Sequence, residues 1–184
     1  MAGPNGELDW HMQQWNDEMG EYAFQQLSQA DTILVGRVAY EAMADFWPTA
    51  FKAPGSKKGD IGYAHMMNSY PKIVFSKTLS TVKWANSRLV KAGIREEVIK
   101  LKQQPGKDMI MWGGVGIAST FIQMGLIDEY RIWIAPVILG KGMRPGTEAK
   151  ANCVLELLNT VRFSNGVVLL CYQCKPNSLT GEIE

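Results

Sequence analysis

Residues 108–136 decide the fold, and they read DMIMWGGVGIASTFIQMGLIDEYRIWIAP. The stretch opens with a short apolar run, 109–112, which has the length of a buried strand. Beyond the paired glycines, apolar residues recur at the helical spacing, at Ile117, Phe121 and Met124. The sequence therefore predicts a strand, a tight Gly-Gly turn and a helix that starts close to Gly113.

The Gly-Gly turn is also a candidate anion-binding site. The first amides of a helix have no acceptors within the helix, and they carry the positive end of its dipole. Gly113, Gly114 and Gly116 lack the β-carbons that would keep a phosphate away. We expect a phosphate or pyrophosphate to dock there, although two glycines taken alone fit a turn that packs a helix on its strand at least as well.

Length and composition limit the classes of protein to which the chain can belong. The chain has 184 residues, and residues 1–184 are expected to form a single domain with a full hydrophobic core. Lysine plus arginine (19) nearly balances aspartate plus glutamate (18), and no basic stripe is present, so no nucleic-acid partner is expected. No segment approaches the roughly 20 apolar residues of a membrane helix, and no signal-peptide pattern is visible. A soluble, cytoplasmic protein is therefore predicted.

The cysteines and histidines predict neither redox chemistry nor a metal site. Cys153, Cys171 and Cys174 lie in apolar segments, and we interpret all three as buried free thiols. A spacing of three residues in a strand would point Cys171 and Cys174 to opposite faces. The two histidines, His11 and His65, lack a metal-ligand partner three or four residues away.

Hydrophobic patterns along the rest of the chain predict the other elements. Helices are expected at 12–29, 37–46, 61–69 and 94–101, strands at 31–36, 72–76, 87–91 and 129–139, and loops at 1–11 and 47–59. Ser164-Asn165-Gly166 predicts the turn of a hairpin between strands at 154–163 and 167–175. This order predicts an α/β fold, with a mainly parallel sheet flanked by helices and an antiparallel C-terminal hairpin.

Four motifs in a fixed order resemble a known family. They are ADTILVGRVAYE (30–41), VFSKTL (74–79), MWGGVGIASTFIQMGLIDEY (111–130) and APVILGKG (135–142). On these motifs the chain resembles the dihydrofolate reductase-like family, and most closely its branch with the riboflavin-biosynthesis reductase, the RibD C-terminal domain. The resemblance covers nearly the entire chain and implies the fold of that family.

The resemblance implies an NADPH site at the carboxyl edge of the parallel sheet, where α/β folds bind ligands. The pyrophosphate would lie on the helix after Gly113-Gly114, and Arg37, Ser76 and Lys77 would hold the ribose 2'-phosphate. The residues that the resemblance places against the cofactor are Gly36, Arg37, Ser76, Lys77, Thr78, Trp112, Gly113, Gly114, Val115, Gly116 and Ile117. Two cations and a hydroxyl suit a doubly charged phosphate, so NADPH is expected to bind better than NADH.

Alternatives to this interpretation stay open at the sequence level. Residues 76–78 alone also fit a solvated strand end with a serine turn. The G-x-G-x-x-G fingerprint of the Rossmann dehydrogenases and the P-loop are both absent, so the prediction of nucleotide binding depends on the family resemblance.

The chain departs from the family pattern in two places. Ala39 stands where many relatives carry Thr, so one hydroxyl expected to assist phosphate binding is missing, and a lower affinity for the cofactor is expected. The family's central first strand has no counterpart before Met1-Ala-Gly-Pro. Without that strand, two rows of backbone groups would lose their partners, each at about 1 to 3 kcal/mol. We therefore expect the sheet to show either a gap or a substitute strand.

The sequence does not identify a proton donor. Trp10 and the residues before it resemble the dihydrofolate reductase loop in which a Trp precedes the helix with the active-site acid, so Trp10 would cover the nicotinamide or the substrate. The position of that acid falls at Trp15 or Asn16, and neither is an acid. Asn16 lies on the inward stripe of the helix and Glu18 near its border. Both are catalytic candidates, although Glu18 equally fits a solvated helix face and Asn16 can bind a substrate edge but cannot supply a proton.

The leading interpretation is an NADPH-dependent reductase of a small heterocyclic substrate, most like 5-amino-6-(5-phosphoribosylamino)uracil reductase of riboflavin biosynthesis. Its candidate substrate pocket contains Trp10, Asn16, Lys141 and Arg144, and the two cations fit a substrate phosphate or an ordinary surface loop. Dihydrofolate reductase is an alternative that Asn16 disfavours. A catalytically silent nucleotide-binding dimer is a third. The resemblance also implies a homodimer, for which the apolar hairpin offers a surface.

Overall fold

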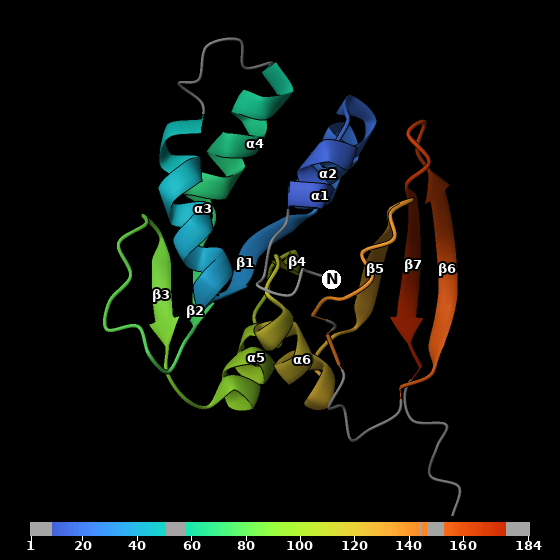
Figure 1. Cartoon of the computed structure of the whole chain (residues 1–184). Coiled ribbons are helices and arrows are strands. Elements are labelled where there is room, and N and C mark those ends of the chain that lie inside the picture. Colours follow the sequence, from blue (N-terminus) through green and yellow to red (C-terminus); the bar gives the residue numbers. More distant parts are fainter. Residues whose placement is uncertain (1–8, 51–57, 144, 147–152, 176–184) are drawn as a thin grey trace, which may run out of the picture. The chain divides into compact units, whose positions relative to one another are not determined.

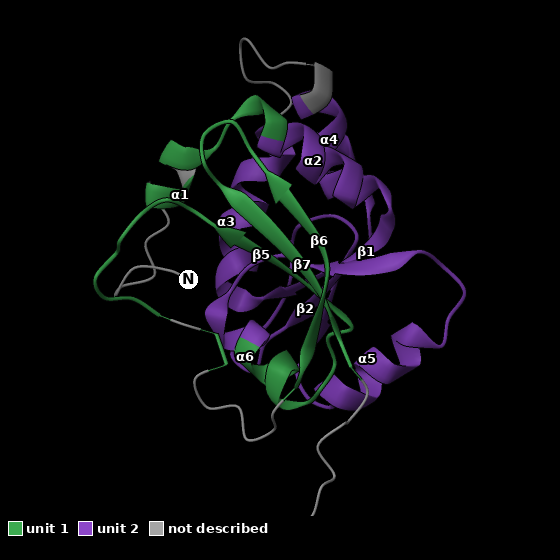
Figure 2. Ribbon diagram, turned by 90° about the vertical axis from the view of Figure 1, so that its right-hand side faces the viewer, with its two compact units in different colours: residues 1–18, 119–184 green, residues 19–118 purple. Residues whose placement is uncertain are grey.

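The computed structural model describes residues 9–50, 58–143, 145–146 and 153–175. The chain divides into two compact units, coloured separately in Figure 2. Unit 1 comprises residues 1–18 and 119–184, and unit 2 comprises residues 19–118. The prediction of a single domain over 1–184 stays a proposal. Each unit is described by itself below.

The helices and strands follow one another as labelled in Figure 1. The helices are α1 (Asp9–Gln14), α2 (Asp17–Ser28), α3 (Arg37–Ala50), α4 (Lys58–Ser69), α5 (Ile94–Lys102) and α6 (Val115–Gln123). The strands are β1 (Ala30–Gly36), β2 (Lys72–Phe75), β3 (Ser87–Val90), β4 (Asp108–Met111), β5 (Glu129–Ile134), β6 (Leu155–Arg162) and β7 (Val168–Cys174). No helix among these is long and apolar enough to cross a membrane.

Unit 2 contains a four-stranded parallel sheet with the strand order β3-β2-β1-β4. In the register of its central strand, Gly36 pairs with Phe75 of β2, and Leu34 pairs with Met111 of β4. Because all four strands run in the same direction, their carboxyl ends meet at one edge of the sheet. The predicted strands and the predicted mainly parallel sheet are confirmed.

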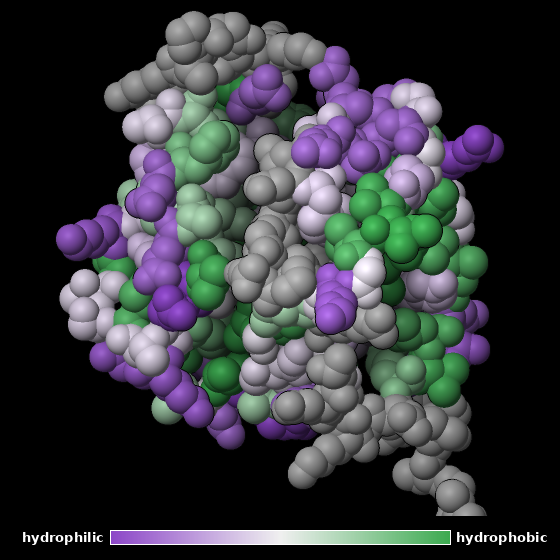
Figure 3. All heavy atoms as spheres, viewed as in Figure 1, coloured by the Kyte–Doolittle hydropathy of each residue, from purple (hydrophilic) through white to green (hydrophobic). Residues whose placement is uncertain are grey.

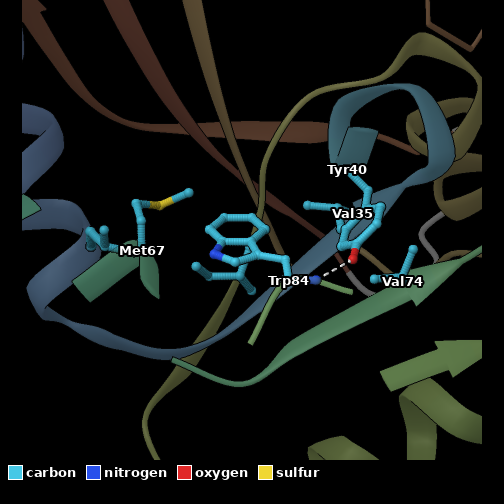
Figure 4. Packing of buried hydrophobic residues seen from close by; sticks show 7 residues of the cluster. Val35, Tyr40, Met67, Val74 and Trp84 are labelled. Atoms are coloured by element: carbon cyan, nitrogen blue, oxygen red, sulfur yellow. Dashed lines mark hydrogen bonds between the residues drawn. The ribbon is translucent and has the colours of Figure 1, made fainter. Parts of the chain in front are cut away.

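A hydrophobic core joins α2, α3 and α4 to this sheet, and the close-up in Figure 4 shows its residues. Its buried members are Leu27, Ile33, Val35, Tyr40, Met67, Val74 and Trp84. The hydroxyl oxygen of Tyr40 accepts hydrogen bonds from the backbone N–H groups of Lys83 (2.8 Å) and Trp84 (2.9 Å). Tyr40 therefore fixes the β2–β3 connection on α3, the helix that begins at the carboxyl edge of the sheet.

A fully buried lysine, Lys72, caps the C-terminal end of α4. Its ammonium donates hydrogen bonds to the carbonyls of Met67 (2.9 Å), Asn68 (3.1 Å) and Tyr70 (2.8 Å). In a continuing helix the Met67 carbonyl would accept from the N–H four residues later, but that residue is Pro71, which has no N–H. Lys72 thus supplies the donor that the proline removes.

Unit 1 contains a three-stranded antiparallel sheet with the order β5-β7-β6. Asn165-Gly166 forms the turn between β6 and β7, with Gly166 at φ 85°, so the predicted hairpin is confirmed. The two sheets are separate, and β4 and β5 each lie at the edge of their own sheet within the described residues. The expectation of either a gap or a substitute strand stays a prediction.

The structure corrects the predicted cysteine chemistry. Cys153 and Cys174 form a disulfide, and of the three cysteines only Cys171 is a buried thiol outside a disulfide. The antiparallel register places Leu155 opposite Cys174, which brings residue 153 close to the last residue of β7. This pairing depends on contacts between distant parts of the chain, so the local patterns around each cysteine do not predict it.

Several predicted boundaries are also wrong, and one of them is the start of α4, which begins at Lys58, inside the loop expected at 47–59. The single helix expected at 12–29 is in fact two helices, α1 and α2, which Trp15-Asn16 separates. In addition, α1 starts inside the loop expected at 1–11. The helix expected at 37–46 continues through Pro48 to Ala50. Trp47 explains this extension, because its ring packs on Tyr63 (5.2 Å between centroids) and its carbonyl accepts from Asn68. The strand expected at 129–139 ends at Ile134, before Pro136.

Candidate cofactor site

Three loops of unit 2 follow the carboxyl ends of adjacent strands. Arg37 follows β1, 76–78 follow β2, and 112–114 follow β4. Since β1 lies between β2 and β4, all three loops start from the same edge of the sheet. Gly36 allows α6 to approach the end of β1 closely, because a β-carbon there would lie only 3.0 Å from Cγ2 of Ile117. The structure thus brings together the segments predicted to contact the cofactor.

The Gly-Gly turn has the backbone conformation that glycine alone adopts readily. Gly113 has φ 63° and Gly114 has φ 86°, and both residues are exposed. A β-carbon on Gly113 would lie 3.6 Å from the Ala39 methyl group, and one on Gly114 would lie 3.3 Å from Ile117. The first hydrogen bond of α6 joins the Ala118 N–H to the Gly114 carbonyl (3.0 Å). The positive end of this helix dipole therefore lies beside bare, accessible backbone.

The loop after β2 presents one cation and a serine turn. The Ser76 hydroxyl oxygen accepts hydrogen bonds from the N–H groups of Thr78 (3.2 Å) and Leu79 (3.0 Å), and it lies 3.4 Å from the Thr78 hydroxyl. The serine turn that the sequence left open is therefore present. Lys77 is exposed at its tip and makes no ion pair within the described residues. Its ammonium is available to an anion.

The second cation, Arg37, already has an anionic partner. Its Nη1 atom lies 2.9 Å from Oε2 of Glu41, one turn later on α3, and about half of each side chain is exposed. Sequence reasoning singled out Arg37 but missed Glu41. The spacing of four residues between opposite charges on a helix is the signal that could have identified this contact.

Trp112 links the glycine turn to the sheet. Its backbone N–H donates to the Leu34 carbonyl of β1 (3.2 Å), which extends the β1–β4 pairing by one bond. The indole Nε1 is buried and has no hydrogen-bond partner within the described part of the chain. A buried donor without an acceptor is uncommon and often marks a functional site.

The candidates for the substrate pocket lie in unit 1. Asn16 donates to the Ser164 hydroxyl (3.3 Å), and the Glu18 carboxylate accepts from the Ser164 N–H (2.9 Å). Both side chains therefore hold the β6–β7 turn, and their catalytic roles stay predictions. Lys141 is exposed. The second cationic candidate, Arg144, lies outside the described residues.

Trp10 belongs to an aromatic series in unit 1. Its ring meets His11 edge-on at 5.8 Å, His11 lies 5.4 Å from Trp15, and Trp15 stacks on Trp133 at 5.9 Å. Burial lowers the pKa of His11 below 6.5, so its imidazole is neutral at neutral pH. Like Trp112, Trp10 has a buried indole Nε1 with no partner among the described residues.

The loops of unit 2 fit an anionic dinucleotide. The glycine turn leaves a space beside the backbone, which a β-carbon would fill. The dipole of α6 favours negative charge in that space. Lys77 and Arg37 supply positive charge at the neighbouring strand ends. Backbone dipoles for a pyrophosphate and side-chain cations for a further phosphate are the chemistry that NADPH requires.

Comparison with known proteins places this geometry in context. The family model for the RibD C-terminal domain matches residues 1–169. The protein YyaP of Bacillus subtilis, which is described as uncharacterized, is 37% identical over 172 residues, covering 94% of this chain and 87% of YyaP.

Two solved structures share the fold. A Thermotoga maritima diaminohydroxyphosphoribosylaminopyrimidine deaminase/5-amino-6-(5-phosphoribosylamino)uracil reductase matches with a TM-score of 0.60 and 15% identity, over 95% of this chain. This chain spans about half of that protein, 52% of its length. Dihydrofolate reductase from Enterococcus faecalis, complexed with NADP(H), matches with a TM-score of 0.58 and 13% identity, over 96% of this chain and 90% of that one. These likenesses confirm the dihydrofolate reductase-like fold.

Proposed function

The chain belongs to the family of RibD C-terminal domains, and on this premise we propose that it is an NADPH-dependent reductase of a small heterocyclic substrate. The substrate proposed is 5-amino-6-(5-phosphoribosylamino)uracil or a close analogue. The observation that carries the proposal is the arrangement of the three loops at one edge of the parallel sheet, with Gly113-Gly114, Lys77 and Arg37. Membership of the family by itself supports an oxidoreductase of the riboflavin-biosynthesis type.

Each loop has a distinct role in this proposal. The glycine turn and the start of α6 hold the pyrophosphate, since only bare backbone lets a phosphate approach the helix so closely. Arg37 and Lys77 hold the ribose 2'-phosphate through charge-assisted hydrogen bonds, with Ser76 and Thr78 beside them. When bound, NADPH supplies a hydride to the substrate. The chain contributes by positioning the cofactor and the acceptor and by excluding water.

The choice of substrate is tested by the oxidation of NADPH in the presence of each acceptor. The proposal expects loss of NADPH absorbance with the phosphoribosylaminouracil and little or none with dihydrofolate. The reverse result would favour the alternative of dihydrofolate reductase. If NADPH binds but neither acceptor oxidises it, the catalytically silent nucleotide-binding protein is the better account.

Replacing Lys77 by Ala is expected to weaken the binding of NADPH and to leave the binding of NADH unchanged. A charged hydrogen bond to phosphate stabilises by about 1.5 to 3 kcal/mol, which corresponds to about a tenfold or larger loss of affinity. Isothermal titration of both cofactors measures this difference. Lys100→Ala, which removes an exposed lysine of α5, is the control. An equal loss for both cofactors would contradict the assignment of Lys77 to the 2'-phosphate.

We further propose that the protein forms a homodimer through the sheet of unit 1. Figure 3 shows hydrophobic side chains gathered over β5, β7 and β6, where Ile132, Ile134 and Leu157 are exposed. A charge at Ile134, which is 50% exposed, is expected to separate the subunits. Sedimentation velocity of Ile134→Glu measures this, with Asn159→Glu as the control because it lies on the opposite face of the sheet. A monomeric wild-type protein would contradict the proposal.

The predicted location in the cytoplasm stays a proposal as well.

A further inference from the structure

One ion pair at the candidate site limits how Arg37 can meet a ligand. Arg37 is the first residue of α3, and the Glu41 carboxylate binds its guanidinium at 2.9 Å. Lys77 at the neighbouring strand end has no such partner among the described ion pairs. The two cations proposed for the phosphate are therefore not equivalent, because only one of them is already neutralised by the protein.

We propose that Glu41 competes with the ribose 2'-phosphate for Arg37 and thereby sets how strongly the protein prefers phosphorylated nucleotides. This inference rests on the proposed cofactor site. A carboxylate and a phosphate both bind a guanidinium through its paired N–H groups. If Glu41 keeps its bond, its negative charge lies close to a doubly charged phosphate. If it releases Arg37, the ion pair is lost. In both cases Glu41 weakens phosphate binding.

The surroundings of Glu41 allow the release. Its side chain is 48% exposed, and the residue lines a groove of about 690 Å³ between α3 and the β2–β3 connection. Lys83 lines the same groove. Asp45, one further turn along α3, lines the groove as well and makes no ion pair within the described residues. Asp45 is therefore a matched control for the general effect of removing a negative charge.

The test uses two ligands that differ only by the phosphate in question, adenosine 2',5'-bisphosphate and adenosine 5'-monophosphate. Their affinities are measured by isothermal titration for the wild type, Glu41→Gln, Asp45→Asn, Arg37→Gln and the double variant Arg37→Gln/Glu41→Gln. Circular dichroism checks that each variant is folded. We expect Glu41→Gln to bind the bisphosphate about threefold to tenfold more tightly, as for the loss of one partly exposed charge near a phosphate. The affinity for the monophosphate should not change.

The double variant tests whether Glu41 acts through Arg37. The gain from Glu41→Gln should be smaller when Arg37 is already Gln, because no guanidinium is left to release and only the direct repulsion between carboxylate and phosphate is relieved. Unchanged or weaker binding of the bisphosphate by Glu41→Gln, an equal gain for Asp45→Asn, or a gain of undiminished size in the double variant would overturn the inference alone. A wild-type protein that does not distinguish the two nucleotides would overturn both the inference and the phosphate site on which it rests.

Discussion

Replacing Gly114 by Ala is expected to lower the affinity for NADPH by about tenfold or more, as for the loss of a close contact between backbone and phosphate. The new methyl group would occupy the exposed space beside the start of α6. Gly114 has φ 86°, a conformation that costs a residue with a β-carbon about 1 to 2 kcal/mol, so the variant should still fold. Equilibrium dialysis with NADPH measures the loss of affinity.

A second glycine provides the control for this experiment. Gly93 has φ 67° and precedes α5, where a β-carbon would meet only the Glu96 carboxylate at 3.5 Å. Gly93→Ala therefore carries a similar conformational cost without a predicted role in binding. Both variants should lose comparable stability, and only Gly114→Ala should lose NADPH. Normal binding by Gly114→Ala would show that the glycine turn does not contact the cofactor.

Replacing Lys72 by Met is expected to destabilise the protein by about 2 to 4 kcal/mol, because the carbonyls of Met67 and Tyr70 would lose the donor that the ammonium supplies. The carbonyls of Met67 and Tyr70 accept from the Lys72 ammonium, whereas that of Asn68 also accepts from Asn86 (3.1 Å). Methionine replaces the aliphatic stem but supplies no N–H group. Urea unfolding followed by circular dichroism measures the change. Lys100→Met, at an exposed position on α5, should change the free energy of unfolding by less than about 0.5 kcal/mol.

The same lysine predicts a pH dependence. Burial lowers the pKa of Lys72 from 10.5 to about 8 in the folded protein. Between these values the unfolded chain holds a proton that the folded chain has released, so the free energy of unfolding rises with pH. The difference in stability between the wild type and Lys72→Met should therefore be constant below pH 8 and increase from pH 8 to 10.5. A difference that stays constant over this range would mean that the three carbonyls hold the pKa of the ammonium at or above 10.5.

Local patterns were sufficient for the elements that form the site. Buried runs predicted β1, β2 and β4, and the stripe from Ile94 to Leu101 predicted α5, because each depends on residues that are neighbours in the sequence. The glycine pair marked the start of α6 to within two residues. The loops that the family resemblance grouped together do follow adjacent strands of one parallel sheet.

The features that escaped prediction depend on contacts between distant residues. A loop was expected from Trp47 onward, yet the packing of Trp47 on α4 carries α3 to Ala50. The partner of Cys174 follows from the register of two strands, which no local pattern around Cys153 reveals. The contacts of Asn16 with the β6–β7 turn, 148 residues later, are of the same kind. Glu41 could have been found, since its spacing from Arg37 is local.

The measurement that tests the central claim most directly is the quenching of tryptophan fluorescence by reduced cofactors. The chain has six tryptophans, and one of them, Trp112, adjoins the glycine turn. If the three loops hold a dinucleotide through its phosphates, NADPH should quench this fluorescence to saturation and transfer energy to the nicotinamide, and NADH should bind much more weakly. A folded protein whose fluorescence does not respond specifically to millimolar NADPH would contradict the account.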